Sequence, residues 1–199
     1  MTYPAIEQQL EETQTLIDPI AIPPEWDTDL FGEETTYFVT GATYHKRPLL
    51  ASTEVKTYLF TLLHEAFQKC KWELQHWVIL DNHYHVLGKS LHDKDLSEIF
   101  DSVHGRLTTY IRYHANYEDQ IWENYWSYCP KSLEDYMNRV NYLLMNPVTH
   151  GYVLDLRDYP FSSFHDALAN EGRDQLVQQL TTFTGYKHLI LHEAHRDEF

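Results

Sequence analysis

The alternation of two hydrophobic periods across residues 35–165 most constrains how this chain folds. Segments rich in β-branched and aromatic residues, which favour strands, are found at 35–43, 72–80, 83–89 and 121–126. Apolar residues recur with helical spacing at 53–67, 93–114 and 133–146. The predicted order is β-α-β-β-α-β-α. It favours an α+β fold, in which a ferredoxin-like antiparallel sheet carries helices packed on one face.

Local signals set the expected ends of these elements. Thr53 is the expected N-cap of the first helix, and Ser132 with Asp135 forms a variant of the capping box. Asp81-Asn82 is a favourable turn between two strands. Asn146-Pro147 is expected to end the last helix, because the residue before a proline avoids helical backbone angles.

The chain divides into three expected parts. Residues 1–34 combine four prolines with acidic residues and read as an acidic N-terminal arm with a short helix near 6–16. Residues 35–165 form the folded domain. Residues 166–199 are a C-terminal extension with little pattern beyond a weak helix near 173–180.

The net charge of −15 by itself argues against a nucleic-acid binder, which usually has a basic face. Much of this excess lies in the arm, where residues 1–34 hold nine acids and no Lys or Arg. Residues 35–165 hold 15 acids and 12 bases, so the domain is nearly balanced. The arm is expected to be a solvated tail, and shielding of a basic groove is the alternative.

Other features favour a cytoplasmic protein that does not enter a membrane. Hydrophobic residues make up 43% of the chain, and no stretch approaches the 18 apolar residues of a membrane span. The N-terminus has no secretory pattern. Cys70 and Cys129 are expected to be reduced thiols, because two cysteines build no disulfide framework.

His83-Tyr84-His85 lies on a predicted strand. Alternate strand residues point to the same face, so both imidazoles can bind one metal ion while Tyr84 packs into the core. With 13 histidines in the chain, roughly one His-x-His is expected by chance. A pair of surface or cross-strand histidines without a ligand is therefore the alternative.

Tyr142 stands apart from the apolar stripe of its predicted helix. The stripe consists of Leu133, Met137, Val140 and Leu144. Tyr142 lies on the opposite face, with Asn138 and Asn146 one turn before and after it. A phenolate projected toward a site can act as a nucleophile, and Asn146 can supply an oxygen ligand beside the histidines. An ordinary half-exposed surface tyrosine is the alternative.

Several segments in the same order resemble a known family. The segment 80–87, LDNHYHVL, resembles the HUH segment of the single-tyrosine transposases. The segment 140–151, VNYLLMNPVTHG, is similar to the YIxxNPVxxG segment of their REP-associated branch, and 159–164, YPFSSF, to the WPxSS segment that follows. Residues 121–123 and 105–110 match the segment before the catalytic helix and the second helix. Together they cover about two-thirds of the chain.

The resemblance implies the HUH nuclease version of the ferredoxin-like fold. It implies single-stranded or hairpin DNA as the partner, and a monomer or a homodimer. Mg²⁺ or Mn²⁺ would bind His83 and His85, with Asn146 as the third ligand. Tyr142 would be the nucleophile that cleaves DNA, leaving a 5′-phosphotyrosine and a free 3′-OH, and the reverse step would join strands.

The sequence also departs from the family. Asp81 stands where proline is frequent, the run 123–128 carries no basic residue, and the basic C-terminal tail of many relatives is missing. Phosphate contacts supply much of the affinity for DNA. The candidate DNA contacts are Lys46, Arg47, Lys89, Arg106, Arg112, Lys131, Arg139 and the stacking residue Trp122.

Two other functions remain open at this point. One is a DNA-hairpin-binding descendant that keeps the fold without cleaving. The other is an unrelated metal hydrolase or an acidic interaction domain in which the His-x-His is accidental.

Overall fold

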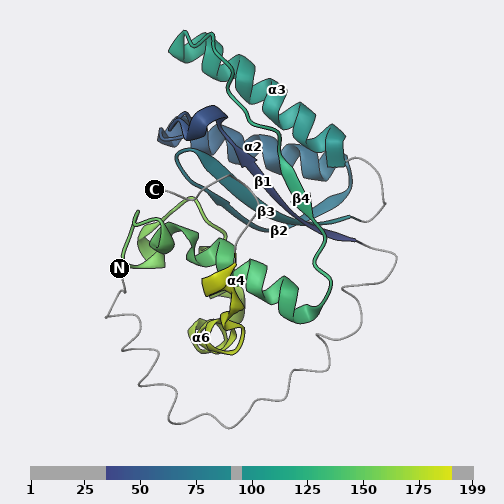
Figure 1. Cartoon of the computed structure of the whole chain (residues 1–199), viewed down its shortest axis with the longest axis vertical. Helices are drawn as coiled ribbons and strands as arrows, with labels where there is room; N and C mark the ends of the chain where they lie inside the picture. Colours follow the sequence, from purple (N-terminus) through teal and green to yellow (C-terminus); the bar gives the residue numbers. More distant parts are fainter. Residues whose placement is uncertain (1–34, 91–95, 190–199) are drawn as a thin grey trace.

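A computed structural model describes residues 35–90 and 96–189. Within them, the chain forms a four-stranded antiparallel sheet in the order β2-β3-β1-β4 (Figure 1). The strands are β1 (Thr36–Ala42), β2 (Trp72–Ile79), β3 (His83–Ser90) and β4 (Trp126–Tyr128). The fold is α+β, as predicted, and β3 lies inside the sheet between β2 and β1.

Helices cover both faces of this sheet, so the expectation of helices on one face is wrong. Helices α2 (Thr53–Lys69) and α3 (Leu96–Ala115) lie on one side, and α4 (Leu133–Thr149) lies on the other (Figure 1). The physical reason is that both faces of the strands are apolar. Val39 and Val86 pack with α2 and α3, whereas Phe38 and Leu87 pack with α4.

The C-terminal segment packs behind α4 as a further layer. It consists of η4 (Leu156–Asp158), α5 (Phe164–Glu171), α6 (Arg173–Thr182) and η5 (Thr184–His188). The weak helix expected near 173–180 is α6, while α5 had no clear signal in the sequence. Leu176 and Phe183 join the same buried cluster as Val140 of α4, so α4 is enclosed between the sheet and this segment.

Several expected boundaries differ from the structure. Ser52 rather than Thr53 caps α2, because its hydroxyl accepts from the Val55 N–H. Helix α4 continues through Pro147 to Thr149. Pro147 is buried there, so packing outweighs the conformational preference of the residue before it.

The strand expected at 121–126 lies later, at Trp126–Tyr128, and Trp122 makes only an isolated bridge to Thr43. The turn at Asp81-Asn82 forms as predicted, closed by the hydrogen bond from the Leu80 N–H to the His83 carbonyl at 2.8 Å. Ser132 caps α4 as predicted, accepting from the Asp135 N–H.

Some expectations fall outside the described residues, namely the arm 1–34 with its helix near 6–16 and the start of α3 at Asp93. The boundaries of the three expected parts stay predictions. No helix in the described part of the chain combines the length and apolar character needed to cross a membrane.

Candidate active site

The two histidines of the His-Tyr-His segment lie on the face of β3 that α4 covers. Their ring centroids are 4.9 Å apart. Tyr84 between them points to the other face, where it is fully buried in the cluster formed with α2 and α3. The alternation of side chains along a strand thus places both imidazoles on one side, as the sequence predicts.

A polar neighbour orients each imidazole. Nδ1 of His83 lies 2.7 Å from the Asn82 amide oxygen, and Nδ1 of His85 lies 2.7 Å from the Thr40 hydroxyl. The Asn82 amide nitrogen donates to the Lys46 carbonyl, so its oxygen faces His83. Because an amide oxygen only accepts, Nδ1 of His83 carries the hydrogen and Nε2 is left with its lone pair.

Burial keeps these imidazoles neutral. It lowers the pKa of His83 to about 3, and the nearby His150 adds to this effect. The pKa of His85 is also held well below its usual value, again chiefly by burial. Neutral imidazole is the form that binds metal ions, so both residues are in that form at neutral pH.

Tyr142 and Asn146 of α4 lie against the histidines. The Tyr142 ring packs edge-on at 5.4 Å from the His85 ring and 6.4 Å from the Phe38 ring, measured between centroids. Asn146, one turn later, is fully buried, and hydrogen bonding to it raises the pKa of His83. The structure therefore brings all four predicted site residues together.

The surroundings of the Asn146 amide decide whether a cation fits this site. Apart from the contact with His83, the buried amide atoms of Asn146 have no hydrogen-bond partner among the described residues. A buried polar group of this kind calls for an explanation, such as an ion. No cluster of three or more His, Cys, Asp or Glu side chains in the described part of the chain is suited to hold a metal. Two neutral imidazoles and the Asn146 oxygen are nevertheless a donor set that suits divalent cations.

Asn138 does not share the surroundings of Tyr142, although both were expected on one face. Its amide oxygen accepts from the Tyr186 N–H at 3.1 Å and so belongs to the contact with η5. Helix α4 is buried on nearly all sides, so an opposite face does not mean an exposed one.

Sequence reasoning missed three side chains beside the histidines. His150, at the end of α4, has its ring centroid 5.2 Å from that of His83. Its spacing of four residues from Asn146 was the available signal. Asn82 could be suspected as the neighbour of His83. Thr40 had no signal, because only the strand register places it opposite His85.

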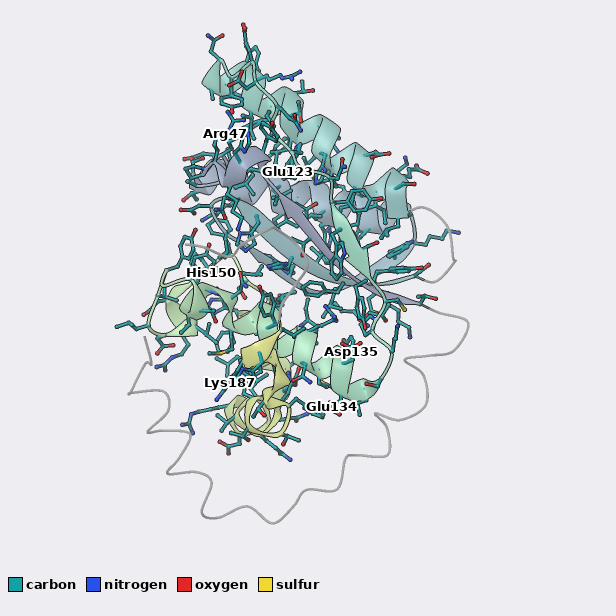
Figure 2. The ribbon with its side chains drawn as sticks, in the orientation of Figure 1. Arg47, Glu123, Glu134, Asp135, His150 and Lys187 are labelled. Atoms are coloured by element: carbon teal, nitrogen blue, oxygen red, sulfur yellow. The ribbon has the colours of Figure 1, made fainter. Side chains whose placement is uncertain are left out.

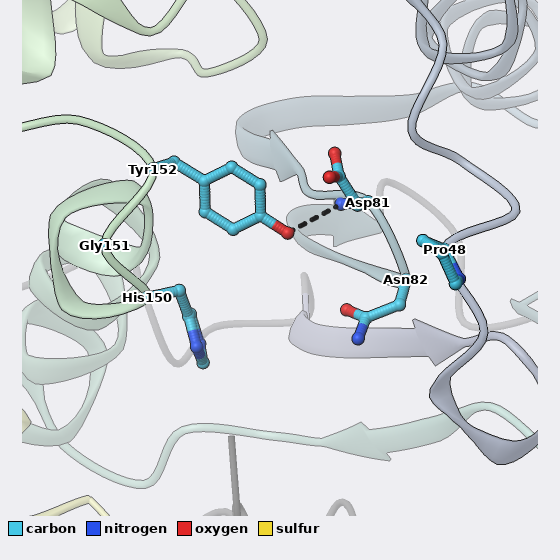
Figure 3. Close-up of a pocket in the computed structure, with 6 residues that line it drawn as sticks. All are labelled: Pro48, Asp81, Asn82, His150, Gly151 and Tyr152. Carbon is cyan, nitrogen blue, oxygen red and sulfur yellow. Dashed lines mark hydrogen bonds between the residues drawn. The ribbon is translucent and has the colours of Figure 1, made fainter.

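A pocket of about 260 Å³ opens next to this group. It is lined by Pro48, Asp81, Asn82, His150, Gly151 and Tyr152 (Figure 3). His150 and Asn82 belong to both the pocket wall and the surroundings of His83. The site therefore adjoins an open space between the β2–β3 turn and the end of α4.

The expected DNA contacts are scattered over the fold. Lys46 lies close enough to His83 for its charge to lower that pKa. Arg47, labelled in Figure 2, pairs with Asp119 at 3.3 Å and donates to the Gln120 carbonyl, both in the loop before β4. Arg106 and Arg112 lie on α3, across the sheet from Tyr142, and Arg106 pairs with Glu65 at 2.7 Å.

The remaining candidates have mostly structural surroundings. Arg139 is buried, pairs with Asp135 at 3.1 Å, and lies 3.7 Å over the Tyr128 ring. The Trp122 ring stacks on His104 at 4.0 Å. Lys89 is half-buried near the end of β3, and Lys131 is exposed before α4.

The sheet, its helices and the group of histidines with a tyrosine define a class of protein. The family model described as "Transposase IS200 like" matches residues 34–139, about half of the chain. That match places the chain among the IS200-like transposases.

A relative in Escherichia coli K12, the REP-associated tyrosine transposase, is 30% identical over 140 residues, which are 67% of this chain and 79% of the relative. A solved structure of a REP-associated tyrosine transposase bound to a REP hairpin superposes with a TM-score of 0.60. It is 24% identical and covers 79% of this chain and 88% of the other. The chain belongs to the REP-associated tyrosine transposase family, and it has that fold.

Proposed function

We propose that this transposase-family chain cleaves and rejoins single-stranded DNA through Tyr142, with a divalent metal held by His83, His85 and Asn146. The observation that carries the proposal is the convergence of these four side chains from β3 and α4. A tyrosine beside two neutral imidazoles and a buried amide has the parts needed for phosphoryl transfer to a protein nucleophile.

The proposed metal is Mg²⁺ or Mn²⁺: the Asn146 oxygen is a ligand type that suits both, and the two imidazoles suit divalent transition metals. When bound, such a cation polarises a phosphate oxygen and offsets the charge that develops on it. The protein orients the two imidazoles, because Asn82 contacts Nδ1 of His83 and Thr40 contacts Nδ1 of His85. Partners of this kind fix the ring orientation of metal-binding histidines.

The proposed chemical step exchanges one phosphodiester bond for another. The Tyr142 phenol loses its proton, and its oxygen bonds to phosphorus as the bond from phosphorus to the 3′ oxygen breaks. The products are a 5′-phosphotyrosine and a strand end whose 3′ oxygen has taken up a proton. Attack by another 3′-OH on the phosphotyrosine reverses the step and joins strands.

The proposed substrate is single-stranded DNA next to a hairpin. It is supported by the solved relative, which is bound to a REP hairpin. Among the expected cations, Lys46 lies near enough to His83 to lower its pKa. Because phosphate contacts carry much of the affinity for DNA, we expect binding to be weak and sensitive to salt. A monomer or a homodimer stays the prediction for the assembly.

The test is cleavage of end-labelled hairpin oligonucleotides, taken from repeats that flank the gene, with Mn²⁺ or with EDTA. We expect a shortened strand only with Mn²⁺, and none with His83→Ala or His85→Ala. His114→Ala, an exposed histidine on α3, is the control and should cleave normally. Retarded DNA on a native gel without any cleavage would contradict the proposal and favour a binding-only protein.

A further inference from the structure

The pocket beside the candidate site is attached to it through two residues. Asn82 contacts Nδ1 of His83, and His150 has its ring 5.2 Å from the His83 ring. Both also line the pocket of about 260 Å³ (Figure 3). DNA held at the histidines would therefore have a neighbouring nucleotide at the pocket.

The chemistry of the lining suits a base better than a phosphate. The lining residues include one carboxylate, Asp81, and no Lys or Arg. The nearby Lys56 ammonium is already paired with Asp81, so the lining offers a phosphate no cation of its own. The volume is slightly below the range of about 300–1,000 Å³ that holds drug-sized ligands, so it suits one planar ring system.

Two of the lining residues, Tyr152 and Pro48, carry rings. Tyr152 lies on one side of the Asp81-Asn82 turn and Pro48 on the other (Figure 3). Tyr152 is 38% exposed, and its hydroxyl accepts from the Asp81 N–H at 3.3 Å, which fixes the ring. Unpaired bases stack on tyrosine rings held in this way.

Asp81 supplies an acceptor for the edge of a base. The Lys56 ammonium donates to its Oδ1 at 2.7 Å and to the Tyr159 hydroxyl at 3.1 Å, so the carboxylate is held in place from the interior. The carboxylate keeps acceptor capacity beyond this ion pair, because its two oxygens offer about four lone-pair positions. A carboxylate oxygen accepts from exocyclic amino groups, such as N4 of cytosine, and thymine has none.

We propose that this pocket binds one unpaired base of the DNA and prefers bases with an exocyclic amino group over thymine. Tyr152 stacks on the base and Asp81 accepts from its amino group. The assignment rests on the proposed function in one respect, namely that DNA is the substrate. It adds a residue pair that sets base preference beside the cleavage site.

The experiment measures binding of fluorescent hairpins with single-stranded tails of dC, dA, dT or abasic units to the full chain. A Tyr142→Phe background prevents cleavage during the measurement. We expect dC and dA tails to bind about tenfold more tightly than dT tails, the size of a good base-edge contact. Asp81→Asn should abolish this preference, because an amide both donates and accepts while it still accepts from Lys56.

Tyr152→Leu should weaken binding of all base-bearing tails to the level of the abasic tail. Tyr113→Leu is the matched control, since Tyr113 is 83% exposed on α3 and should be without effect. Unfolding midpoints of each variant show whether the fold is kept. Equal affinity for dC and dT tails, or an unchanged preference in Asp81→Asn, would overturn the pocket assignment while cleavage by the parent chain still stands. Failure to bind any hairpin would overturn the proposed function as well.

Discussion

At the scale of single residues, polar neighbours from other elements hold the two histidines of β3. The sequence could predict the two pairs of site residues, because each pair lies within one local period. His83 and His85 are two residues apart on a strand, and Tyr142 and Asn146 are one turn apart on a helix. The sequence could not predict the role of Thr40, because Thr40 and His85 are 45 residues apart and meet only through the pairing of β1 with β3. Strand register depends on the whole sheet rather than on local pattern.

The Lys56–Asp81 ion pair gives a prediction at this scale. Lys56 is 5% exposed and has Asp81 as its charged partner at 2.7 Å. Asp81→Ala should destabilise the fold by about 2–3 kcal/mol, because it leaves a buried ammonium without its counter-charge. The partial exposure of Asp81 keeps this loss below that of a fully buried pair. Urea unfolding measures this.

The matched control for that prediction is the exposed pair Lys69–Glu98, at 2.9 Å on the protein surface. Glu98→Ala should change the free energy of unfolding by less than about 1 kcal/mol, because exposed ion pairs contribute little. An Asp81→Ala protein as stable as Glu98→Ala would show that Lys56 does not depend on its partner.

At the scale of elements, α4 is the helix on which the site depends. Arg139 attaches it to the sheet edge, because its guanidinium pairs with Asp135 and lies over the Tyr128 ring of β4. Asn141 attaches it to the C-terminal segment by donating to the Phe183 carbonyl. Its hydrophobic period predicted the helix but not its extension past Pro147, nor the enclosure of its second face by α6 and η5. Helix α5 was missed, because the segment Phe164–Glu171 has only eight residues, and a helix this short depends on its packing against α6 and η4.

Gln179 of α6 tests this attachment. Its side-chain amide donates to the Asn141 oxygen at 2.7 Å, and both residues are buried. Gln179→Ala should lower the free energy of unfolding by about 1–3 kcal/mol, because it leaves a buried amide oxygen without its donor. Hydrogen exchange of the α6 amides should accelerate together with this loss.

Gln175→Ala is the control, because Gln175 is exposed on the same helix. Its effect should stay within about 0.5 kcal/mol. Equal stability of the two variants would mean that the buried amide pair does not hold α6 against α4.

At the scale of the whole molecule, the order of elements followed from the sequence, but the distribution of helices over the two faces did not. The alternation of apolar side chains in β1 and β3 fills both faces. This distribution also separates the expected DNA contacts, since Arg106 and Arg112 lie on α3 while Tyr142 lies on α4. Positions in a sequence do not show which charges share a surface until the faces are known.

Two half-buried histidines, His76 and His104, predict how the stability of the whole fold depends on pH. Burial lowers the pKa of His76 and of His104 to about 4 each. Below about pH 6.5 the unfolded chain binds these protons and the folded chain does not. Stability is therefore present above that pH and is lost as the pH falls toward 4, by about 1.4 kcal/mol per pH unit for each histidine.

Urea unfolding at pH 7, 6 and 5 checks this slope. His104→Gln should reduce it by about 1.4 kcal/mol per pH unit, whereas His114→Gln, at an exposed position on the same helix, should leave it as it is. A parent protein with the same stability at all three values would contradict the account of these half-buried imidazoles.

The central claim is that Tyr142 forms the covalent bond to DNA, and peptide mass spectrometry tests it most directly. The full chain is incubated with hairpin DNA and Mn²⁺, the nucleic acid is digested, and the modified peptide is sequenced. We predict a phosphotyrosine at Tyr142, lost in Tyr142→Phe and retained in Tyr113→Phe, which alters an exposed tyrosine of α3. A phosphotyrosine at any other position, or cleavage that survives Tyr142→Phe, would contradict the claim.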